Sequence, residues 1–489
     1  MRVFFTIFTL LVLTGSALCG DSSAVVGDVI VSGDLPEGDP VPFAKDAFEG
    51  MDASGVTIER IANELLEYYN ERGYPFAQVC LDNLEQIDAG VIDVTMRVVV
   101  GPFTSFDTCE VGGVDPQTAA YLVRISDIQP GRRFSNRSIE TSKRIFRSHR
   151  FLAVDDSVDL VFRDDFSRCI PVFKLRQLPT NLIEGSLGYQ PAYAGQSAFV
   201  RGFARLEFEN LLGRGRRFSI RYNKKDPLSH EVAIGFHQPF VFYQPLAVSA
   251  DLEQLKFDSL YQMISLDAEV EYGEARNVSV RVSGGWGRYT PQGSVFRGIY
   301  HSRRWWWGIG STVNLNAGDL LQVFDLDISY GIKRQYRFAG FAPEDARTTD
   351  TRLEGGYILE TPLIGSLRQS LSVSGAGIVT DESVIPPSDL YKLGGVRNLR
   401  GYREDQFFCE RYALFTAQPE LELATGASFH LFSDGAWMRQ STDDAIFRWG
   451  AGAGFEFLLP TGKLLIDVAW GKGNSFGDGK LYVILESRF

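Results

Sequence analysis

The C-terminal two-thirds of the chain shows a regular alternation of apolar and polar residues, which begins near residue 181. In the segment 266–272, leucine, alanine, valine and tyrosine alternate with three carboxylates. The same two-residue period recurs in 217–222, 278–283 and 324–330. Because successive side chains of a strand point to opposite faces, this pattern predicts strands with one apolar and one polar face.

The number and the charge of these strands favour a membrane β-barrel. The polar faces carry charge on many consecutive strands, and the region has no helical pattern that could cover so large a sheet. In a closed barrel, apolar faces meet lipid, charged faces line a hydrated lumen and no strand edge stays unpaired. At about 19 residues per strand and connection, the segment 180–489 predicts an antiparallel transmembrane β-barrel of about 16 strands, an even number being usual. An extracellular β-sandwich is the alternative.

The first 180 residues predict two copies of one small α+β unit, about 77 residues apart. In the first copy, residues 58–79 have apolar side chains at helical spacing and precede the alternating segment 91–100. In the second copy, residues 135–154 take the helical place, and the strand-like segments 158–162 and 170–175 follow. The two copies therefore share the order in which their elements occur.

Matching residues support this repeat. Tyr68, Tyr69 and Tyr74 of the first copy correspond to Ile145, Phe146 and Phe151 of the second. Each copy also begins with a strand-like segment and a short helical candidate, which are 28–33 with 42–48 and 106–112 with 116–125. Each unit predicts the order strand, helix, helix, strand, strand, folded as one sheet with two helices. Two unrelated small α+β domains of the same order are the alternative.

This order and the helix ending Tyr69-x-x-x-Gly73-Tyr74 resemble the POTRA (polypeptide-transport-associated) domain. The second copy departs from the pattern because Arg150 stands where the family usually has glycine. The resemblance implies POTRA-like domains at residues 20–103 and 104–179. The exposed sheet edge of such a domain can accept an extended polypeptide by strand addition.

The N-terminus has the pattern of an export signal. Arg2 precedes the apolar run 3–13, and small residues follow up to Gly20. We expect a signal peptide at residues 1–19, with Ala17 and Cys19 at the small positions before the cut. A lipidated Cys19 is the alternative, which the bulky Leu18 disfavours. The sequence after this signal contains no apolar run long enough for a transmembrane helix.

Composition narrows the function. Hydrophobic residues make up 44% and aromatic residues 13% of the 489 residues, yet the mean hydropathy is only −0.07, so the apolar residues are interleaved with polar ones. The formal net charge of −12 argues against a general nucleic-acid binder, which needs clustered lysine and arginine. Tryptophans at 305–307, 437 and 470 suit the aromatic girdles of a membrane barrel.

The reactive residue types give no sign of an enzyme. Cys80, Cys109, Cys169 and Cys409 match no zinc spacing; a Cys80–Cys109 disulfide and four independent buried thiols are both open. The five histidines form no His-Glu-x-x-His motif and no catalytic triad pattern. Glycine runs such as 213–215 and 450–454 lack the context of a phosphate loop, and in barrels they mark bends and close strand packing. We therefore expect no enzymatic activity, no metal and no cofactor.

One long connection carries the main candidate site. It lies between the strand-like segments 371–379 and 413–423, and its length of about 33 residues exceeds an ordinary hairpin loop. A loop of this length can fold back into the lumen, where Arg400 could make bidentate hydrogen bonds to carboxylates of the wall. Glu420 and Glu422 share one face of their strand, and Asp434 lies on the next strand. A solvated loop arginine is the alternative.

Within this connection, residues 391–402 (YKLGGVRNLRGY) closely resemble the sixth-loop signature of the BamA/TamA outer-membrane assembly superfamily. The signature residues in this chain are Gly394, Gly395, Leu399, Arg400, Gly401 and Tyr402. Further similarities are the segments 209–216, 238–243, 431–435 and 464–467, and the terminal Phe489, which is similar to the sorting signal of bacterial outer-membrane barrels. The resemblance implies Asp434 and Glu420 as the first partners of Arg400 and Glu422 as the third.

The same resemblance implies a function. It is that of an outer-membrane insertion factor whose barrel folds client β-barrels delivered by N-terminal domains in the periplasm. The implied partners are unfolded outer-membrane or secreted polypeptides, the lipid bilayer, and accessory periplasmic or lipoprotein subunits. A two-partner secretion translocator is the second hypothesis, although residues 20–38 lack the plugging helix with which such translocators usually begin. A passive porin or adhesin is the third, and porins lack both the repeat and the loop signature.

Overall fold

The structure is a computed structural model, and it describes most of the chain after the N-terminal segment. The described residues are 24–36, 48–190, 199–224, 228–257, 261–273, 277–292, 300–317, 320–336, 346–396, 398–439, 445–459, 462–475 and 478–488. The expected signal peptide (1–19), most of the helical candidate 42–48 and the terminal Phe489 lie outside these residues.

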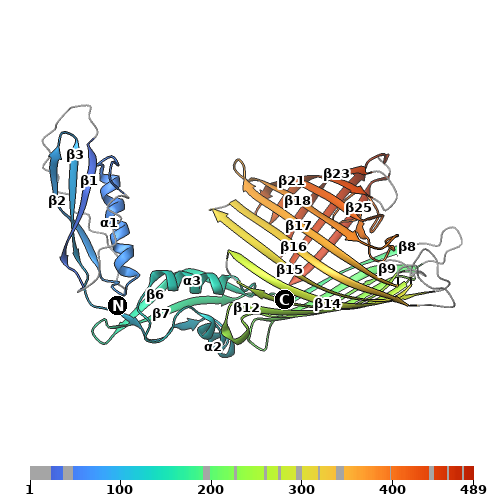
Figure 1. The fold of residues 1–489 in the computed structure, drawn as a ribbon, viewed down its shortest axis with the longest axis horizontal. Helices are drawn as coiled ribbons and strands as arrows, with labels where there is room; N and C mark the ends of the chain where they lie inside the picture. The colour runs from blue at the N-terminus through green and yellow to red at the C-terminus, as the bar shows by residue number, and fades with distance from the viewer. Residues whose placement is uncertain are drawn as a thin grey trace. The chain divides into compact units, whose positions relative to one another are not determined.

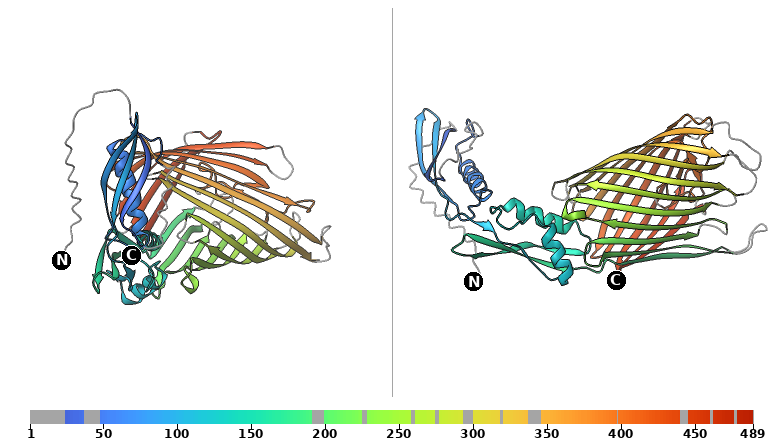
Figure 2. Two further views of the ribbon diagram at one scale, coloured as in Figure 1. Left: turned by 60° about the vertical axis from the view of Figure 1, so that its left-hand side comes forward. Right: turned by 60° about the horizontal axis from the view of Figure 1, so that its bottom comes forward.

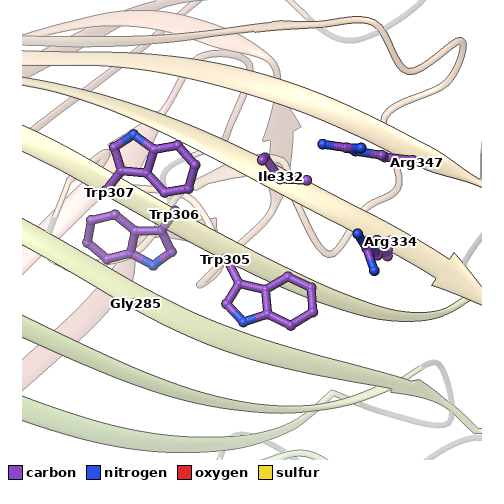
Figure 3. Close-up of a pocket in the computed structure, with 7 residues that line it drawn as sticks. All are labelled: Gly285, Trp305, Trp306, Trp307, Ile332, Arg334 and Arg347. Atoms are coloured by element: carbon purple, nitrogen blue, oxygen red, sulfur yellow. The ribbon is translucent and has the colours of Figure 1, made fainter.

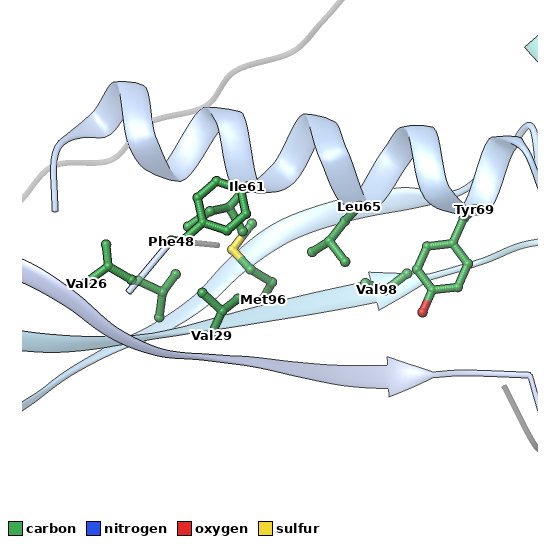
Figure 4. Packing of buried hydrophobic residues seen from close by; sticks show 9 residues of the cluster. Val26, Val29, Phe48, Ile61, Leu65, Tyr69, Met96 and Val98 are labelled. Atoms are coloured by element: carbon green, nitrogen blue, oxygen red, sulfur yellow. The ribbon is translucent and has the colours of Figure 1, made fainter. Parts of the chain in front are cut away.

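The first repeat forms a three-stranded sheet with a helix packed on it (Figures 1 and 4). The strand order is β1-β3-β2, with β1 parallel and β2 antiparallel to the central β3. The bounds are β1 (Val25–Asp34), α1 (Gly55–Asn70), β2 (Gln78–Asp88) and β3 (Val91–Val99). Ile61, Leu65 and Tyr69 recur every four residues, so one face of α1 is buried against the sheet. The predicted helix and the predicted strand 91–100 are both present.

The second repeat forms a small sheet around β7. The bounds are β4 (Ser105–Phe106), β5 (Glu110–Gly112), α2 (Pro116–Ile125), α3 (Asn136–Arg147), β6 (Leu152–Arg163) and β7 (Arg168–Gln177). Helix α2 covers the predicted range 116–125. The predicted strand 106–112 is divided, because β4 pairs with Arg168–Cys169 of β7 whereas β5 pairs with Val172–Lys174. The intervening residues are not paired in the ladder.

The described residues from 182 onward form a closed antiparallel barrel of sixteen strands (Figures 1 and 2), as the alternation predicts. The barrel strands pair in chain order, with β18 followed by β21, and β25 closes the barrel against β8. The bounds are β8 (Leu182–Gln190), β9 (Phe199–Leu211), β10 (Arg216–Lys224), β11 (His230–Gln238), β12 (Leu246–Phe257), β13 (Tyr261–Tyr272), β14 (Val278–Pro291), β15 (His301–Ala317), β16 (Leu320–Tyr336), β17 (Arg347–Pro362), β18 (Leu367–Thr380), β21 (Arg411–Ala424), β22 (Ala427–Arg439), β23 (Ile446–Leu459), β24 (Gly462–Gly471) and β25 (Lys480–Arg488).

The two faces of the barrel wall differ in polarity. Large apolar side chains such as Leu266, Val282 and Leu326 are exposed on the outside. Their neighbours in sequence point inward and are often charged. Trp305, Trp307 and Trp437 are exposed on the outer face, whereas Trp306 points inward and donates a hydrogen bond to Asp267 at 3.0 Å. The period of two residues thus separates an apolar outer surface from a polar lumen.

The chain divides into two compact units, and the second repeat contributes to both. One unit contains residues 1–109, 127–140 and 159–171, and the other contains 110–126, 141–158 and 172–489. Within the described ranges, the helices are too short and too polar to cross a membrane. Among the described residues, the cysteines at 80, 109, 169 and 409 form no disulfide, so the Cys80–Cys109 bond is not formed.

Candidate functional site: the loop inside the barrel

The connection between β18 and β21 folds into a small two-stranded hairpin with a tight tip. Its strands are β19 (Tyr391–Leu393) and β20 (Phe407–Cys409). Gly394 and Gly395 have φ angles of 117° and 105°, a region that side chains other than glycine rarely adopt. A Cβ at Gly395 would also collide with the Glu404 carboxylate, which accepts a hydrogen bond from Val396 N–H at 3.1 Å. The paired glycines of the signature therefore allow the turn that presents residues 399–402.

Arg400 lies against the barrel wall and binds Asp434 of β22. Its backbone N–H and its Nε donate to Asp434 Oδ2 at 3.0 and 2.8 Å, and its Nη2 donates to Oδ1 at 2.9 Å. The guanidinium also stacks on the Phe432 ring, with 3.5 Å between Cζ and the ring centroid. Arg400 is 9% exposed and Asp434 is fully buried. The structure therefore places these two expected residues together, in the bidentate arrangement expected for arginine and carboxylate.

A second carboxylate extends this ion pair along the wall. Arg400 Nη1 lies 3.5 Å from Asp467 Oδ2 on β24 and donates to Gln418 Oε1 on β21 at 3.1 Å. Asp467 Oδ1 in turn lies 2.9 Å from His430 Nε2. Thr416 donates to Asp434 Oδ1 at 3.1 Å. The lumenal network therefore joins one loop arginine to three strands of the wall, and Asp467 and His430 are both nearly fully buried.

The expected partners Glu420 and Glu422 do not contact Arg400 in the part of the chain that the structure describes, so that expectation is corrected. Both belong to β21, where Glu420 pairs with His430 and Glu422 pairs with Ser428. Arg400 sits level with Thr416 and Asp434, which are paired to each other. At about 3.4 Å per residue, Glu420 is about 14 Å further along the strand. The two-residue period gives the correct face of β21 but not the height at which the loop docks.

Glycines of β23 and β24 make room for the loop and for its partners. Asp434, Gly450 and Gly471 are aligned across β22, β23 and β24. A Cβ at Gly450 would collide with the Arg400 carbonyl, and a Cβ at Gly471 would meet the Tyr402 ring. His430, Gly454 and Asp467 are aligned in the same way, so the histidine reaches across the glycine to its carboxylate. Segment 450–454 thus places glycine inward and alanine outward.

The remaining signature residues anchor the tip by packing and by hydrogen bonds. Leu399 is fully buried in a cluster that includes Ala436 and Met438 of the wall. Tyr402 donates from its hydroxyl to the Trp449 carbonyl at 3.0 Å. Gly401 N–H donates to the Tyr482 hydroxyl at 3.2 Å, and that hydroxyl donates to the Tyr402 carbonyl at 3.1 Å. Because Tyr482 belongs to β25, the loop tip contacts the strand that closes the barrel.

A second ionic contact holds the part of the same connection that lies between β18 and β19. Lys333 of β16 lies 2.6 Å from both Glu382 and Asp389, and all three side chains are almost completely buried. Gln335 donates to Glu382 at 2.5 Å. Removing one member of a buried ion pair leaves an uncompensated charge that costs ~3–5 kcal/mol. The loop is thus held at two separate places in the lumen, by Lys333 and by Arg400.

Another group of contacts joins helix α2 to the turn between β9 and β10. Asp115 caps α2, and its hydrogen bonds with Thr118 hold the pKa of its carboxyl below the usual value. Thr118 accepts a hydrogen bond from Asn210 Nδ2 at 2.8 Å. A Cβ at Gly213 would lie 2.9 Å from Gln117 Cβ, and one at Gly215 would approach the Tyr121 hydroxyl. The segment 209–216, which resembles the family sequence, therefore forms the contact between the barrel and α2.

The short helix η2 (Val241–Tyr243) between β11 and β12 contacts the same small helix. Phe240 stacks on His149, with centroids 5.5 Å apart and an interplanar angle of 14°. His149 Nε2 also lies 3.1 Å from the Tyr121 hydroxyl. Arg124 donates to the Tyr243 hydroxyl at 2.6 Å. The aromatic residues of the segment 238–243 therefore pack on α2 and on His149, two residues after α3.

Sequence reasoning missed His430, and it placed Asp467 only in a late strand. The available signal was the alternation of glycine and alanine in 450–454, because inward glycines indicate that something approaches the wall closely. In the described residues, no group of three or more histidine, cysteine or carboxylate side chains is arranged to hold a metal ion. Phe489 lies outside the described residues.

Fold and loop together define a class: a closed sixteen-stranded antiparallel β-barrel with a long loop fixed inside its lumen and small α+β sheets before it. Residues 327–484, which include the whole loop, match the Omp85 superfamily domain. This part of the barrel is therefore similar to an Omp85 superfamily domain, and the relationship that the loop signature indicates is confirmed at this level.

Solved structures of the same fold cover nearly the whole chain. CdiB from Escherichia coli matches with a TM-score of 0.63 at 13% identity, covering 98% of this chain and 93% of the other. CdiB from Acinetobacter baumannii matches with a TM-score of 0.62 at 12% identity, covering 96% and 91%. BamA from Haemophilus ducreyi lacking POTRA domains 1–3 matches with a TM-score of 0.53 at 14% identity, covering 95% and 100%. No curated protein sequence matches the chain.

Proposed function

We propose that this protein is an outer-membrane insertion factor, whose barrel opens between β8 and β25 and offers its edges to the strands of client β-barrels. The observation that carries the proposal is the short closing seam. Among the described residues, β25 and β8 share four residue pairs, from Leu485↔Gly185 to Arg488↔Leu182, whereas the other neighbouring strands of the barrel share at least eight. The seam is the place where the barrel separates with the smallest loss of backbone hydrogen bonds.

The chemistry of an open seam suits a client strand. Backbone N–H and C=O groups left unpaired in lipid cost several kcal/mol each, on the order given for buried polar groups. An incoming strand would pair with these groups, and burial of its apolar face in lipid would supply the driving force without a nucleotide. The loop supports this role because its tip is hydrogen-bonded to Tyr482 of β25. The Arg400 network would then hold the loop while the seam opens and closes.

The first small sheet supports delivery of an extended client from the periplasm, where we place the N-terminal domains. β2 is an edge strand of the order β1-β3-β2. Leu81, Leu84 and Ile87 on this strand are 43%, 46% and 56% exposed. A client segment could add to this edge and cover these side chains. Unfolded polypeptides are therefore the proposed partners, with accessory subunits joining at the same side of the membrane.

Depletion of the protein tests this proposal. If the chain inserts barrels, its loss lowers the abundance of many outer-membrane barrels, which quantitative proteomics of the outer-membrane fraction measures. An unchanged barrel content after depletion would contradict the insertion function. The abundance of the inner-membrane proteins in the same cells is the control for a general loss of envelope proteins.

A two-partner secretion translocator is the second candidate, and the extent of the CdiB likeness favours it. The two CdiB structures match this chain with higher TM-scores than BamA does. In this case the lumen would conduct an extended polypeptide after the loop moves. Depletion would then remove one large secreted protein from the medium and leave the other outer-membrane barrels at their normal level.

A further inference from the structure

Four arginines are aligned side by side across the outer surface of the barrel, on β14, β15, β16 and β17. Arg288 pairs with Arg303, Arg303 pairs with Arg334, and Arg334 pairs with Arg347. Residues directly opposite in antiparallel strands point to the same face, and all four side chains are exposed. We refer to Arg288, Arg303, Arg334 and Arg347 as the arginine row. With strands about 4.8 Å apart, the row is about 14 Å long.

The arginine row lies at one edge of the apolar outer band. On β16, the outward residues preceding Arg334 are Phe324, Leu326, Ile328, Tyr330 and Ile332. They extend for about 27 Å along the strand at about 3.4 Å per residue, close to the height of a lipid-facing band once strand tilt is included. The arginine row lies near one end of the barrel strands, and the β9–β10 turn that contacts α2 lies at the other end. In the proposed orientation the arginine row lies in the outer leaflet of the membrane.

An open pocket of about 490 Å³ adjoins the row (Figure 3). Its lining residues are Gly285, Trp305, Trp306, Trp307, Ile332, Arg334 and Arg347, of which Trp305, Trp307 and Ile332 are the outward-facing apolar ones. Figure 3 shows the two arginines close together, to the right of the tryptophans. The neighbouring Gly284 pairs with Trp307 and adds no side chain to the outer face. The pocket therefore combines two guanidinium groups with an aromatic and aliphatic lining.

The arginine row has no carboxylate partner within the described parts of the chain, unlike other arginines of this barrel. Arg304, adjacent in sequence to Arg303, points inward and binds Asp350 at 2.6 Å. Arg411 and Arg439 form another outward pair, but Glu410 lies 3.8 and 3.3 Å from them. Like charges directly opposite on neighbouring strands destabilise a sheet. Arg303 Cζ lies 5.6 Å from the centroid of the Tyr336 ring, a neutral group. Four guanidinium groups in register without a carboxylate among the described residues therefore favour a polyanion at this surface.

We propose that the arginine row binds the phosphate groups of an anionic lipid, whose acyl chains lie on the apolar outer face of β14–β17. Guanidinium groups bind phosphate with two parallel hydrogen bonds each, and the row is long enough for two phosphate groups on one headgroup. A lipid is favoured over a soluble phosphate because the pocket continues into Trp305, Trp307 and Ile332, which an acyl chain or a sugar ring would cover. The inference rests on the membrane placement proposed above, and it holds for an insertion factor and a translocator alike.

Native mass spectrometry of the full mature chain tests this site. Protein released from detergent would be titrated with diphosphorylated lipid A, with its monophosphorylated form and with phosphatidylcholine. We expect the diphosphorylated lipid to bind best, and R288Q/R303Q/R334Q/R347Q to weaken its binding by about tenfold or more, as expected for lost charge-assisted hydrogen bonds. The matched control is R411Q/R439Q, which removes the outward arginine pair that shares Glu410 and should bind as the unchanged protein does.

Three results would overturn the inference. They are equal binding of all three lipids, equal weakening by the control variant, and binding of inorganic pyrophosphate as tight as that of the diphosphorylated lipid. A heat-dependent shift in gel mobility shows that each variant retains a folded barrel, and R288K/R303K/R334K/R347K, which keeps the charge, serves if the glutamine variant does not fold. Failure of the insertion function would leave lipid binding by the purified chain intact, so the two proposals fail separately.

Discussion

At the scale of single residues, Arg400 is the group that holds the tip of the loop, while Lys333 holds the other end. We expect Arg400→Ala to keep a closed barrel but to loosen the tip, because it leaves Asp434 buried without its cation at a cost of ~3–5 kcal/mol. Proteinase K digestion of the folded protein would measure the change as faster cleavage between β18 and β21. Arg403→Ala is the matched control, since Arg403 is an exposed arginine of the same tip. Cleavage of R400A at the rate of the unchanged protein would contradict the role assigned to this ion pair.

The cysteines give a second prediction at this scale. Cys80 is exposed, whereas Cys109, Cys169 and Cys409 are buried, and burial raises the pKa of the Cys169 thiol to about 12. A maleimide at neutral pH should therefore modify Cys80 in the folded protein and all four cysteines after unfolding, as mass spectrometry of peptides would show. Modification of Cys169 at the rate of Cys80 in the folded chain would show that the second small sheet is open. Cys80→Ser is the control.

The resemblance of the loop to the family signature implied the pairing of Arg400 with Asp434, but the rest of the network was not predictable. The loop signature marks Arg400, and the two-residue period marks which carboxylates face inward. Whether Glu420 or Asp467 completes the site depends on the height at which the tip docks, which Gly450 and Gly471 determine by leaving space. Those contacts join residues more than forty positions apart, and no local pattern reports them.

At the scale of elements, the contact of α2 with the β9–β10 turn makes a defined prediction. Gly213→Ala should loosen α2, because the added Cβ would lie 2.9 Å from Gln117 Cβ and overpacking of this kind costs about 1–3 kcal/mol. Hydrogen exchange of the α2 amides in the full chain would report the change. Gly131→Ala is the matched control, since both glycines have a positive φ (64° and 80°) but Gly131 has open space around it. If the α2 amides exchanged equally fast in the two variants, the effect of Gly213→Ala would come from backbone strain and not from a collision with Gln117.

The elements also differ in how well the sequence predicts them. Helix α2 follows from its own residues, because Asp115 and Pro116 mark its start and its apolar residues share one face. β2 was not placed, because nearly all of its residues are exposed and two register shifts interrupt its pairing with β3. An edge strand without a buried face has no alternation to detect. The division of the segment 106–112 into β4 and β5 has a similar cause, since it depends on the register of each piece against β7.

At the scale of the whole molecule, the number of barrel strands was predictable from the sequence, but the extent to which the last strand pairs with the first was not. Sixteen strands follow from the alternation and the length of the segment, because each strand carries its own two-residue period. How far β25 pairs with β8 depends on where the first and last strands meet after the other fifteen ladders have formed. No local feature of 182–190 or 480–488 indicates that only four pairs form there.

This short seam leads to the prediction that separates the two candidate functions. In a Cys80→Ser chain, G185C/L485C should form a disulfide across the seam, because these residues are direct partners in the register. If clients enter through the seam, the oxidised protein should lose insertion of a denatured β-barrel client into proteoliposomes, and a reductant should restore it. A250C/A268C, a partner pair inside the β12–β13 ladder, is the matched control and should leave activity unchanged in both redox states. A seam that is locked and yet fully active would exclude lateral opening and favour transport through the lumen, because a conduit for an extended chain needs the loop to move but leaves every strand of the wall paired.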